Sequence, residues 1–187
     1  MNIVELAVAA IRACEAENVE HMLTGAFATS CYGIPRSTKD VDLVLATHEL
    51  AQMESVIRRL SPEVEFDGQV QFDTLTWGRR RIGCTRVSPF LKVELFELFD
   101  DAFVQEQFAR RVRLNVTTLD SVAYVPTAED VIVQKLRWAR DKDVIDAADV
   151  LAVQGAESLD MDYVRNWCRL HGSEVRLDEI LAKMPKI

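Results

Sequence analysis

The chain has 187 residues, the length of one domain, and its 49% hydrophobic and 28% charged residues are typical of a soluble globular protein. This composition excludes collagen-like, disordered and low-complexity classes. Lys and Arg number 22 and Asp and Glu number 30, giving a formal net charge of −8. An acidic chain lacks the diffuse positive field that drives non-specific binding to DNA or to anionic membranes, so we expect neither function.

The cysteines and the N-terminus favour a cytoplasmic location. The cysteines lack Cys-x-x-Cys spacing and are predicted to be reduced, small apolar residues: Cys14, Cys31, Cys84 and Cys168. The three histidines form no ligand cluster, which makes a zinc site unexpected. The chain reaches Glu5 before any apolar run, and no stretch approaches the roughly 20 apolar residues of a membrane span. We therefore expect no signal peptide and no membrane contact.

The first third of the chain is predicted to alternate helices and strands. Apolar residues at helical spacing predict an amphipathic helix over residues 2–17. Apolar runs bounded by glycine and proline predict the next elements. These are a strand over 19–24, a helix over 26–31, a strand over 41–46 and a helix over 48–60.

The middle of the chain favours β-structure and its last third favours helices. Alternating or continuous apolar runs predict strands over 63–67, 69–77, 80–87, 91–98 and 111–116. Thr127 with Asp130 three residues later predicts the start of one long helix over 127–153. Two shorter helices follow, around 160–170 and 176–184. We expect a single α/β (α+β) domain over residues 1–187, of which residues 127–187 form a helical C-terminal part.

Two acids open an otherwise apolar strand, at Asp40 and Asp42. Side chains at i and i+2 of a strand project from the same face, roughly 6.5–7 Å apart along the chain. That separation lets two carboxylates bracket a pair of Mg²⁺ ions about 3.5–4 Å apart. Several such pairs occur by chance in a chain with 30 acids. The Gly25 turn and the short helix that precede this pair distinguish it from the chance pairs.

The segment from Gly25 to Asp42, with Gly33-Ile-Pro-Arg-Ser-Thr-Lys-Asp-Val-Asp at its end, resembles the polymerase-beta-like nucleotidyltransferase superfamily. The signature of that superfamily is an apolar residue, Gly-Ser or Gly-Gly, a short helix, and Asp-x-Asp on the next strand. The segment is most similar to small bacterial nucleotidyltransferases, including those related to abortive-infection toxins. The resemblance implies a mixed sheet flanked by helices, with a C-terminal helical cap.

The resemblance also implies roles for the matching residues. Asp40 and Asp42 would hold two catalytic Mg²⁺ ions, and Gly25 and Ala26 would lie against the triphosphate of an NTP substrate. Glycine permits the close backbone approach that such a contact needs. Ala26 stands where the family usually has Ser or Gly, which removes one hydroxyl contact to a phosphate.

The family further requires a third carboxylate on a neighbouring strand, as a base or metal ligand for the incoming hydroxyl. Residues 92–98 offer Glu94 and Glu97, which face opposite sides of a strand. Glu94 shares the face of Lys92 and fits the family's pattern of a basic residue, an apolar residue, the acid and an apolar residue. The resemblance therefore favours Glu94 as the third catalytic and metal-binding acid. The alternative is a solvated acid on an edge strand.

A second resemblance to the same toxin-related group lies in the predicted helix over 127–153. Lys135 corresponds to a lysine that faces the nucleotide phosphates, and Arg36 and Thr38 would shape the loop beside the nucleotide. At 100° per residue, Lys135 falls on one stripe with Lys142 and Asp146. The alternative is a solvated helix face with i,i+4 pairs such as Lys142–Asp146.

Two groups of arginines lie near predicted strand ends. Arg79, Arg80 and Arg81 follow Trp77 at a predicted hairpin tip, and a second group spans residues 110–113. Basic residues beside an aromatic ring can contact RNA or phosphate. The alternative is that they are loop charges.

The resemblance thus predicts a Mg²⁺-dependent enzyme that transfers a nucleoside monophosphate (NMP) from an NTP to a hydroxyl acceptor and releases pyrophosphate. The acceptor would be a protein side chain, an RNA end or a small molecule. The alternative is a catalytically silent nucleotide-binding or toxin–antitoxin interaction module on the same fold, which Ala26 and the Glu at position 94 favour. A homodimer is compatible with both hypotheses.

Overall fold

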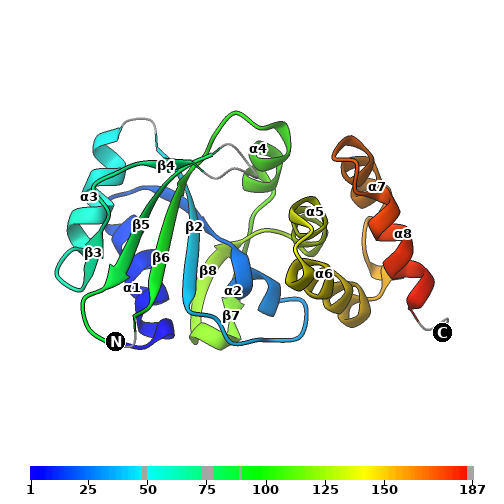
Figure 1. Ribbon diagram of the computed structural model, residues 1–187, viewed down its shortest axis with the longest axis horizontal. Coiled ribbons are helices and arrows are strands. Elements are labelled where there is room, and N and C mark those ends of the chain that lie inside the picture. Colours follow the sequence, from blue (N-terminus) through cyan, green and yellow to red (C-terminus); the bar gives the residue numbers. More distant parts are fainter. Residues whose placement is uncertain (48–49, 73–77, 89, 185–187) are drawn as a thin grey trace.

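The computed structural model describes residues 1–47, 50–72, 78–88 and 90–184. Within these ranges a mixed six-stranded sheet has the strand order β1-β2-β6-β5-β3, with β4 paired to β5 outside this path (Figure 1). The strands are β1 (Glu20–Leu23), β2 (Asp40–Ala46), β3 (Val64–Phe66), β4 (Gln71–Phe72), β5 (Arg79–Thr85) and β6 (Lys92–Glu97). β2 and β6 are parallel neighbours, whereas the other paired strands of this sheet are antiparallel.

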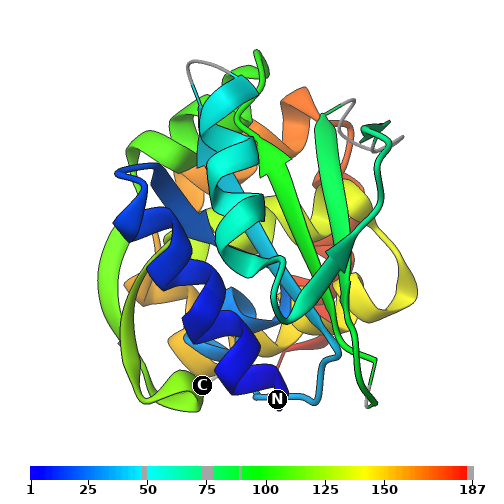
Figure 2. The ribbon, with the colours of Figure 1, turned by 90° about the vertical axis from the view of Figure 1, so that its left-hand side faces the viewer.

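Helices α1 (Ile3–Ala16) and α3 (Leu50–Leu60) cover one face of this sheet and lie side by side (Figure 2). α1 begins with a capping box, in which Asn2 and Glu5 each accept a hydrogen bond from the backbone N–H of the other. Alternate residues of β2 and β6 are fully buried in the core with these helices: Val41, Leu43, Leu45, Val93 and Leu95. Because side chains alternate along a strand, residues 40, 42 and 94 project from the opposite face.

The remaining elements lie on the side of that opposite face and beyond the edge strand β1. They comprise the short helix α2 (Gly25–Ser30), α4 (Ala102–Ala109), and a hairpin of β7 (Val112–Val116) and β8 (Ser121–Val125) joined through the 3₁₀ turn η1 (Thr117–Leu119). Then follow α5 (Ala128–Trp138), α6 (Asp141–Gln154), the 3₁₀ turn η2 (Ala156–Ser158), α7 (Met161–Leu170) and α8 (Glu174–Lys183). α7 and α8 lie at the end of the molecule farthest from α3 (Figure 1).

The predicted fold class is confirmed, and most predicted elements occur within a few residues of their expected bounds. The described part of the predicted helix over 48–60 begins at Leu50, and residues 48–49 lie outside the described residues. The predicted strand over 69–77 is described only as far as Phe72, where β4 ends. The sequence analysis assigned no element to α4 or β8. α4 has only eight residues, and its N-cap, Asp101, accepts a hydrogen bond from the backbone of Val104 at 3.0 Å.

The prediction of one long helix over 127–153 is wrong. α5 ends at Trp138, Ala139 adopts a left-handed conformation with φ of 55°, and α6 begins at Asp141. The backbone N–H of Ala139 closes α5 by donating to the carbonyl of Lys135 at 2.9 Å. No glycine or proline marks this break, and it lets α6 fold back against α5.

All four cysteines are free thiols, and Cys84 is exposed rather than packed as a small apolar residue. Among the helices of the described ranges, none combines the length and the apolar character needed to cross a membrane.

Replacing Ala139 with Gly is expected to raise the free energy of unfolding by about 0.5–1 kcal/mol, because glycine adopts the left-handed conformation without a Cβ clash. Urea denaturation measures the difference. The matched control is Ala152→Gly, an exposed position within α6, where the same substitution is expected to lower stability by about 1 kcal/mol. Equal destabilisation by both substitutions would contradict the left-handed break.

Candidate active site

Three carboxylates lie on the sheet face opposite α1 and α3. Asp40 and Asp42 project from β2, and Glu94 on β6 lies directly beside Asp42 in the parallel register. Glu97 pairs in register with the buried Leu45 on the other face, and its carboxylate binds Arg79 at 2.6 Å. The structure therefore brings Glu94, and not Glu97, next to the two aspartates.

Two cations from the same sheet bind the carboxylate of Glu94. Nη1 of Arg80 lies 2.8 Å from Oε2, and Nζ of Lys92 lies 2.5 Å from Oε1. Lys92 also reaches Oδ1 of Asp40 at 3.4 Å. The Glu94 side chain is only 7% exposed, so these charge-assisted contacts offset the cost of burying it.

The carboxyl group of Asp42 carries the clearest electrostatic signature of the site. Burial, together with the negative charges of Glu94 and Asp40, raises its pKa to about 7, and the nearby Lys92 only partly opposes this rise. A carboxyl group with a pKa near 7 loses its proton to solvent readily when a cation binds beside it. Strong perturbation of this kind, in a cleft, is typical of functional sites.

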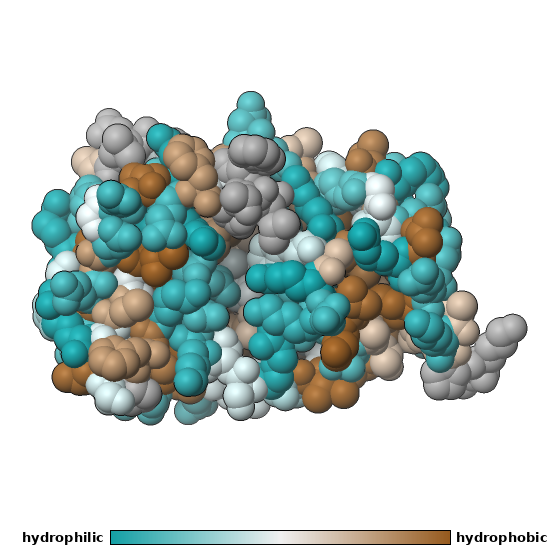
Figure 3. All heavy atoms as spheres, viewed as in Figure 1, coloured by the Kyte–Doolittle hydropathy of each residue, from teal (hydrophilic) through white to brown (hydrophobic). Residues whose placement is uncertain are grey.

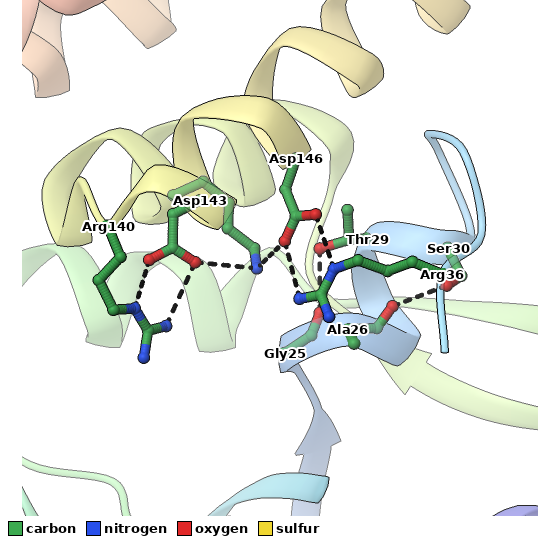
Figure 4. A network of polar contacts seen from close by, with 9 residues as sticks. Gly25, Ala26, Thr29, Ser30, Arg36, Arg140, Asp143 and Asp146 are labelled. Carbon is green, nitrogen blue, oxygen red and sulfur yellow. Dashed lines mark hydrogen bonds and ion pairs between the residues drawn. The ribbon is translucent and has the colours of Figure 1, made fainter. Parts of the chain in front are cut away.

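A tight glycine turn supports Asp42 from the side of α2. Gly25 has φ of +64°, and a Cβ added there would lie 2.0 Å from Oδ2 of Asp42. Only glycine therefore permits both the turn and the close approach. Ala26 follows in the first turn of α2, and the short helix is braced by hydroxyl groups that donate to its carbonyls, Thr29 to Gly25 and Ser30 to Ala26 (Figure 4).

The loop between α2 and β2 is tied to both Asp40 and α6. The hydroxyl oxygen of Thr38 accepts from the backbone N–H of Asp40 at 3.1 Å, which shapes the entry into β2. Arg36 forms a bidentate pair with Asp146 of α6, at 2.9 and 3.0 Å. Burial raises the pKa of Asp146, but the hydrogen bonds from Arg36 and Lys135 lower it more, so the pKa lies below its usual value.

Figure 4 shows a continuous ionic network that runs from this loop through α5 to the start of α6. Nζ of Lys135 lies between Asp146 at 2.6 Å and Asp143 at 3.3 Å, and Arg140 binds Asp143 at 2.5 and 3.2 Å. Lys135, Asp143 and Asp146 are each no more than 3% exposed. We call these three residues, together with Arg36 and Arg140, the α5–α6 ionic network.

This network corrects the predicted helical stripe. Lys135 and Asp146 meet because α6 folds back on α5, not because they share one face of a continuous helix. Asp146 binds Arg36 and Lys135 rather than forming the proposed i,i+4 pair with Lys142. Lys142 is exposed at the start of α6.

A cleft of about 300 Å³ joins the carboxylates to the α5–α6 turn. Its walls combine three acids, four cations and two aromatic rings, contributed by Asp40, Asp42, Glu94, Arg80, Lys92, Arg140, Lys142, Phe96 and Trp138. Hydrophilic side chains border the groove between the sheet and these helices in Figure 3. Five of these residues were not predicted from the sequence as site residues: Lys92, Arg140, Lys142, Phe96 and Trp138. The available signal was the charge-rich run at residues 140–143, shortly after Trp138.

Most of the arginines considered for RNA or phosphate contacts have structural partners. Of the first group, Arg79 binds Glu97, Arg81 binds Glu54, and only Arg80 lines the cleft. Trp77, which the sequence analysis placed beside them, lies outside the described residues. Of the second group, Arg110 pairs with the fully buried Asp130 and stacks on Tyr163, and Arg111 pairs with Glu20.

The donor set suits a hard divalent cation. Asp40 and Asp42 offer carboxylate oxygens, the ligands that Mg²⁺ prefers, and the raised pKa of Asp42 reports negative charge that such a cation would neutralise. Within the described ranges, no group of three or more His, Cys, Asp or Glu side chains is arranged to hold one ion. Glu94 points instead to Arg80 and Lys92.

Neither a protein-family model nor a curated protein sequence matches the chain. Solved structures match along nearly its full length. The antibiotic-resistance factor ANT(2'')-Ia superposes with a TM-score of 0.60 at 13% identity, over 94% of this chain and 96% of that chain. A nucleotidyltransferase-like antigenic protein from Paracoccidioides brasiliensis gives 0.55 at 20% identity, over 100% and 96%. The lincosamide antibiotic adenylyltransferase LnuA gives 0.51 at 11% identity, over 82% and 98%.

The chain has the nucleotidyltransferase fold. The resemblance inferred from the Gly25–Asp42 segment is supported at this level, and the link to abortive-infection toxins stays a prediction. In the nucleotidyltransferase fold of this chain, the three carboxylates line one cleft between the sheet and the α5–α6 turn, and the glycine turn lies against Asp42.

Without divalent metal, Asp42→Asn is expected to stabilise the protein at pH 8 by about 1–2 kcal/mol. Since the pKa of Asp42 is about 7 in the folded protein and 3.8 for an ordinary aspartate, ionisation of Asp42 opposes folding, and this effect is complete only above pH 7. The advantage of the variant should therefore shrink as the pH falls from 8 towards 4. Chemical denaturation in EDTA across this range measures it, with Glu97→Gln as the control, and a pH-independent difference would contradict the assignment.

Proposed function

We propose that this protein is a Mg²⁺-dependent nucleotidyltransferase that moves an NMP from an NTP to a hydroxyl acceptor and releases pyrophosphate. The observation that carries the proposal is the parallel register of β2 and β6, which puts Glu94 beside Asp42 at the glycine turn. The fold supports it, because LnuA, a structural neighbour, is an adenylyltransferase.

Asp40 and Asp42 would hold the two Mg²⁺ ions. Bound there, Mg²⁺ would neutralise phosphate charge and favour ionisation of the acceptor hydroxyl. Gly25 would let the backbone approach the triphosphate, and Ala26 would offer its backbone N–H there in place of a side-chain hydroxyl. The exposed ammonium of Lys142 and the guanidinium of Arg140 line the same cleft and would add positive charge along the phosphates.

Glu94 would be the third catalytic carboxylate, receiving or orienting the proton of the acceptor hydroxyl. Three further residues, Thr38, Arg36 and Lys135, would support nucleotide binding indirectly, by holding in place the elements that contact the nucleotide. Thr38 fixes the entry to β2, and the ion pairs of Arg36 and Lys135 anchor α6 so that its first turn faces the carboxylates. We infer a hydroxyl-bearing acceptor of one of three classes: a small molecule, a protein side chain or an RNA end. The structure of ANT(2'')-Ia holds adenylyl-2''-tobramycin, and that of LnuA holds lincomycin, which favours a small molecule.

A second candidate is a catalytically silent nucleotide-binding or toxin–antitoxin module. The observation that favours it is the full occupation of the Glu94 carboxylate by Arg80 and Lys92. Titrating Mg²⁺ in the presence and absence of each NTP, and then measuring pyrophosphate release with a cell lysate as the source of acceptor, separates the two. The silent module binds without turnover.

Asp40→Asn and Asp42→Asn are each expected to lower transfer by at least about a thousandfold, because each removes a carboxylate that would hold Mg²⁺, and the ion would neutralise charge in the transition state. Incorporation of label from NTP into lysate acceptors measures transfer, and circular dichroism checks that both variants fold. Near-wild-type turnover in either variant would contradict the two-aspartate metal site.

Glu94→Gln should lower the rate by at least about a hundredfold, with NTP affinity little changed. Glu97→Gln is the matched control on the same strand and should stay within about tenfold of wild type, or roughly 1.4 kcal/mol of barrier. Side-by-side initial rates and calorimetric NTP affinities test the pair. The reverse ranking would overturn the assignment of the third carboxylate.

A further inference from the structure

We propose that a narrow recess next to the acid cleft holds the hydrogen-bonding edge of the nucleobase of the NTP, so that this chain selects its nucleotide through Gln107, Gln134 and Trp138. The inference rests on the proposed function and extends it to base recognition.

The recess is contiguous with the acid cleft. It encloses about 30 Å³ between the sheet face and helices α4 and α5, and Phe96 and Trp138 line both the recess and the cleft. Val44 continues the β2 face beyond Asp42, and Thr24 immediately precedes the glycine turn. A nucleotide whose phosphates lie at the glycine turn and the aspartates is therefore long enough for its other end to reach the recess.

The walls of the recess are mostly apolar, but three polar atoms in them have no hydrogen-bond partner in the described part of the chain. These atoms are Nε2 of Gln107, Oε1 of Gln134 and Nε1 of Trp138. Gln107 is 3% exposed and Gln134 is 6% exposed, so bulk water does not satisfy them. Buried polar groups without partners destabilise a fold, and apolar side chains of the same shape would not. Three of them around one recess therefore indicate a ligand.

The chemistry of the three atoms defines the ligand. Gln107 and Trp138 carry N–H donors, Gln134 carries a carbonyl acceptor, and none of the described residues that line the recess is charged. A phosphate or a carboxylate in the recess would therefore be desolvated with no positive side chain to pair with it. An uncharged flat ring with donors and acceptors on one edge fits this pattern, and nucleobases have such edges.

The dimensions favour the edge of a ring rather than a whole nucleoside. About 30 Å³ accepts exocyclic groups and the ring atoms beside them, and the rest of the ring would lie at the mouth, next to Phe96 and Trp138. Aromatic side chains at that position allow stacking on a base, a contact that every nucleobase can make. The glutamines would then discriminate among bases through their hydrogen bonds.

Gln107→Leu and Gln134→Leu test the inference, because leucine keeps much of the volume and removes the hydrogen-bonding groups. Calorimetry would measure the affinity of each variant for ATP, GTP, CTP and UTP with Mg²⁺, and for inorganic tripolyphosphate, which has the phosphates and no base. Trp138→Phe removes the indole N–H, retains an aromatic ring, and provides a third variant if either glutamine variant fails to fold. Gln69→Leu, at an exposed glutamine between β3 and β4, is the control.

We expect at least about tenfold weaker binding of the preferred NTP, a flattened ranking of the four NTPs, and tripolyphosphate affinity within about twofold of wild type. The metal-free, ligand-free Leu variants should be at least as stable as wild type. Unchanged affinity for all four NTPs would overturn the inference and assign the recess to water or to the acceptor. A parallel loss of tripolyphosphate affinity would also overturn it. A wild-type protein that binds neither NTP nor tripolyphosphate would instead contradict the proposed function itself.

Discussion

The parallel pairing of β2 with β6 concentrates negative charge on one face of the sheet, and much of the surrounding structure compensates for it. Asp42 and Glu94 are neighbours in register, and Asp40 lies one step along the same face. Because like charges at this separation oppose ionisation, cations must come from nearby elements. Lys92 and Arg80 supply them from β6 and β5, and the pKa of Asp42 remains raised to about 7 even so. The site is therefore poised to accept further positive charge.

The α5–α6 ionic network differs from this cluster, since its central residues, Lys135, Asp143 and Asp146, place charge in the interior. Buried ion pairs seldom add net stability, because desolvation offsets their attraction, but removing one partner leaves an expensive unpaired charge. Lys135 between Asp143 and Asp146 thus favours one arrangement of α6 against α5 over its alternatives. That arrangement brings Arg140 and Lys142 to the carboxylates and places Trp138 between the polar cleft and the apolar recess.

The features that could be predicted from the sequence are those that depend on local backbone geometry. Side-chain alternation along a strand is a property of the backbone, so Asp40 and Asp42 had to share a face, and Glu94 and Glu97 had to be separated, whatever their partners. A turn that needs glycine is likewise local, which made Gly25 recognisable. The helices and strands with clear periodicity, and the fold class that follows from their order, were predictable for the same reason. Short elements such as α4 and β8 have too few residues to show a period.

The sequence by itself determined the faces on which the candidate carboxylates lie, whereas the tertiary structure decided what they meet. The register of Asp42 with Glu94 joins segments about fifty residues apart, and the pair of Arg36 with Asp146 joins segments more than a hundred apart. The left-handed break at Ala139 has no glycine to mark it in the sequence, and the ion pairs of Lys135 across it form only when α6 lies against α5. Such contacts depend on packing between distant elements, and no pattern within one element encodes them.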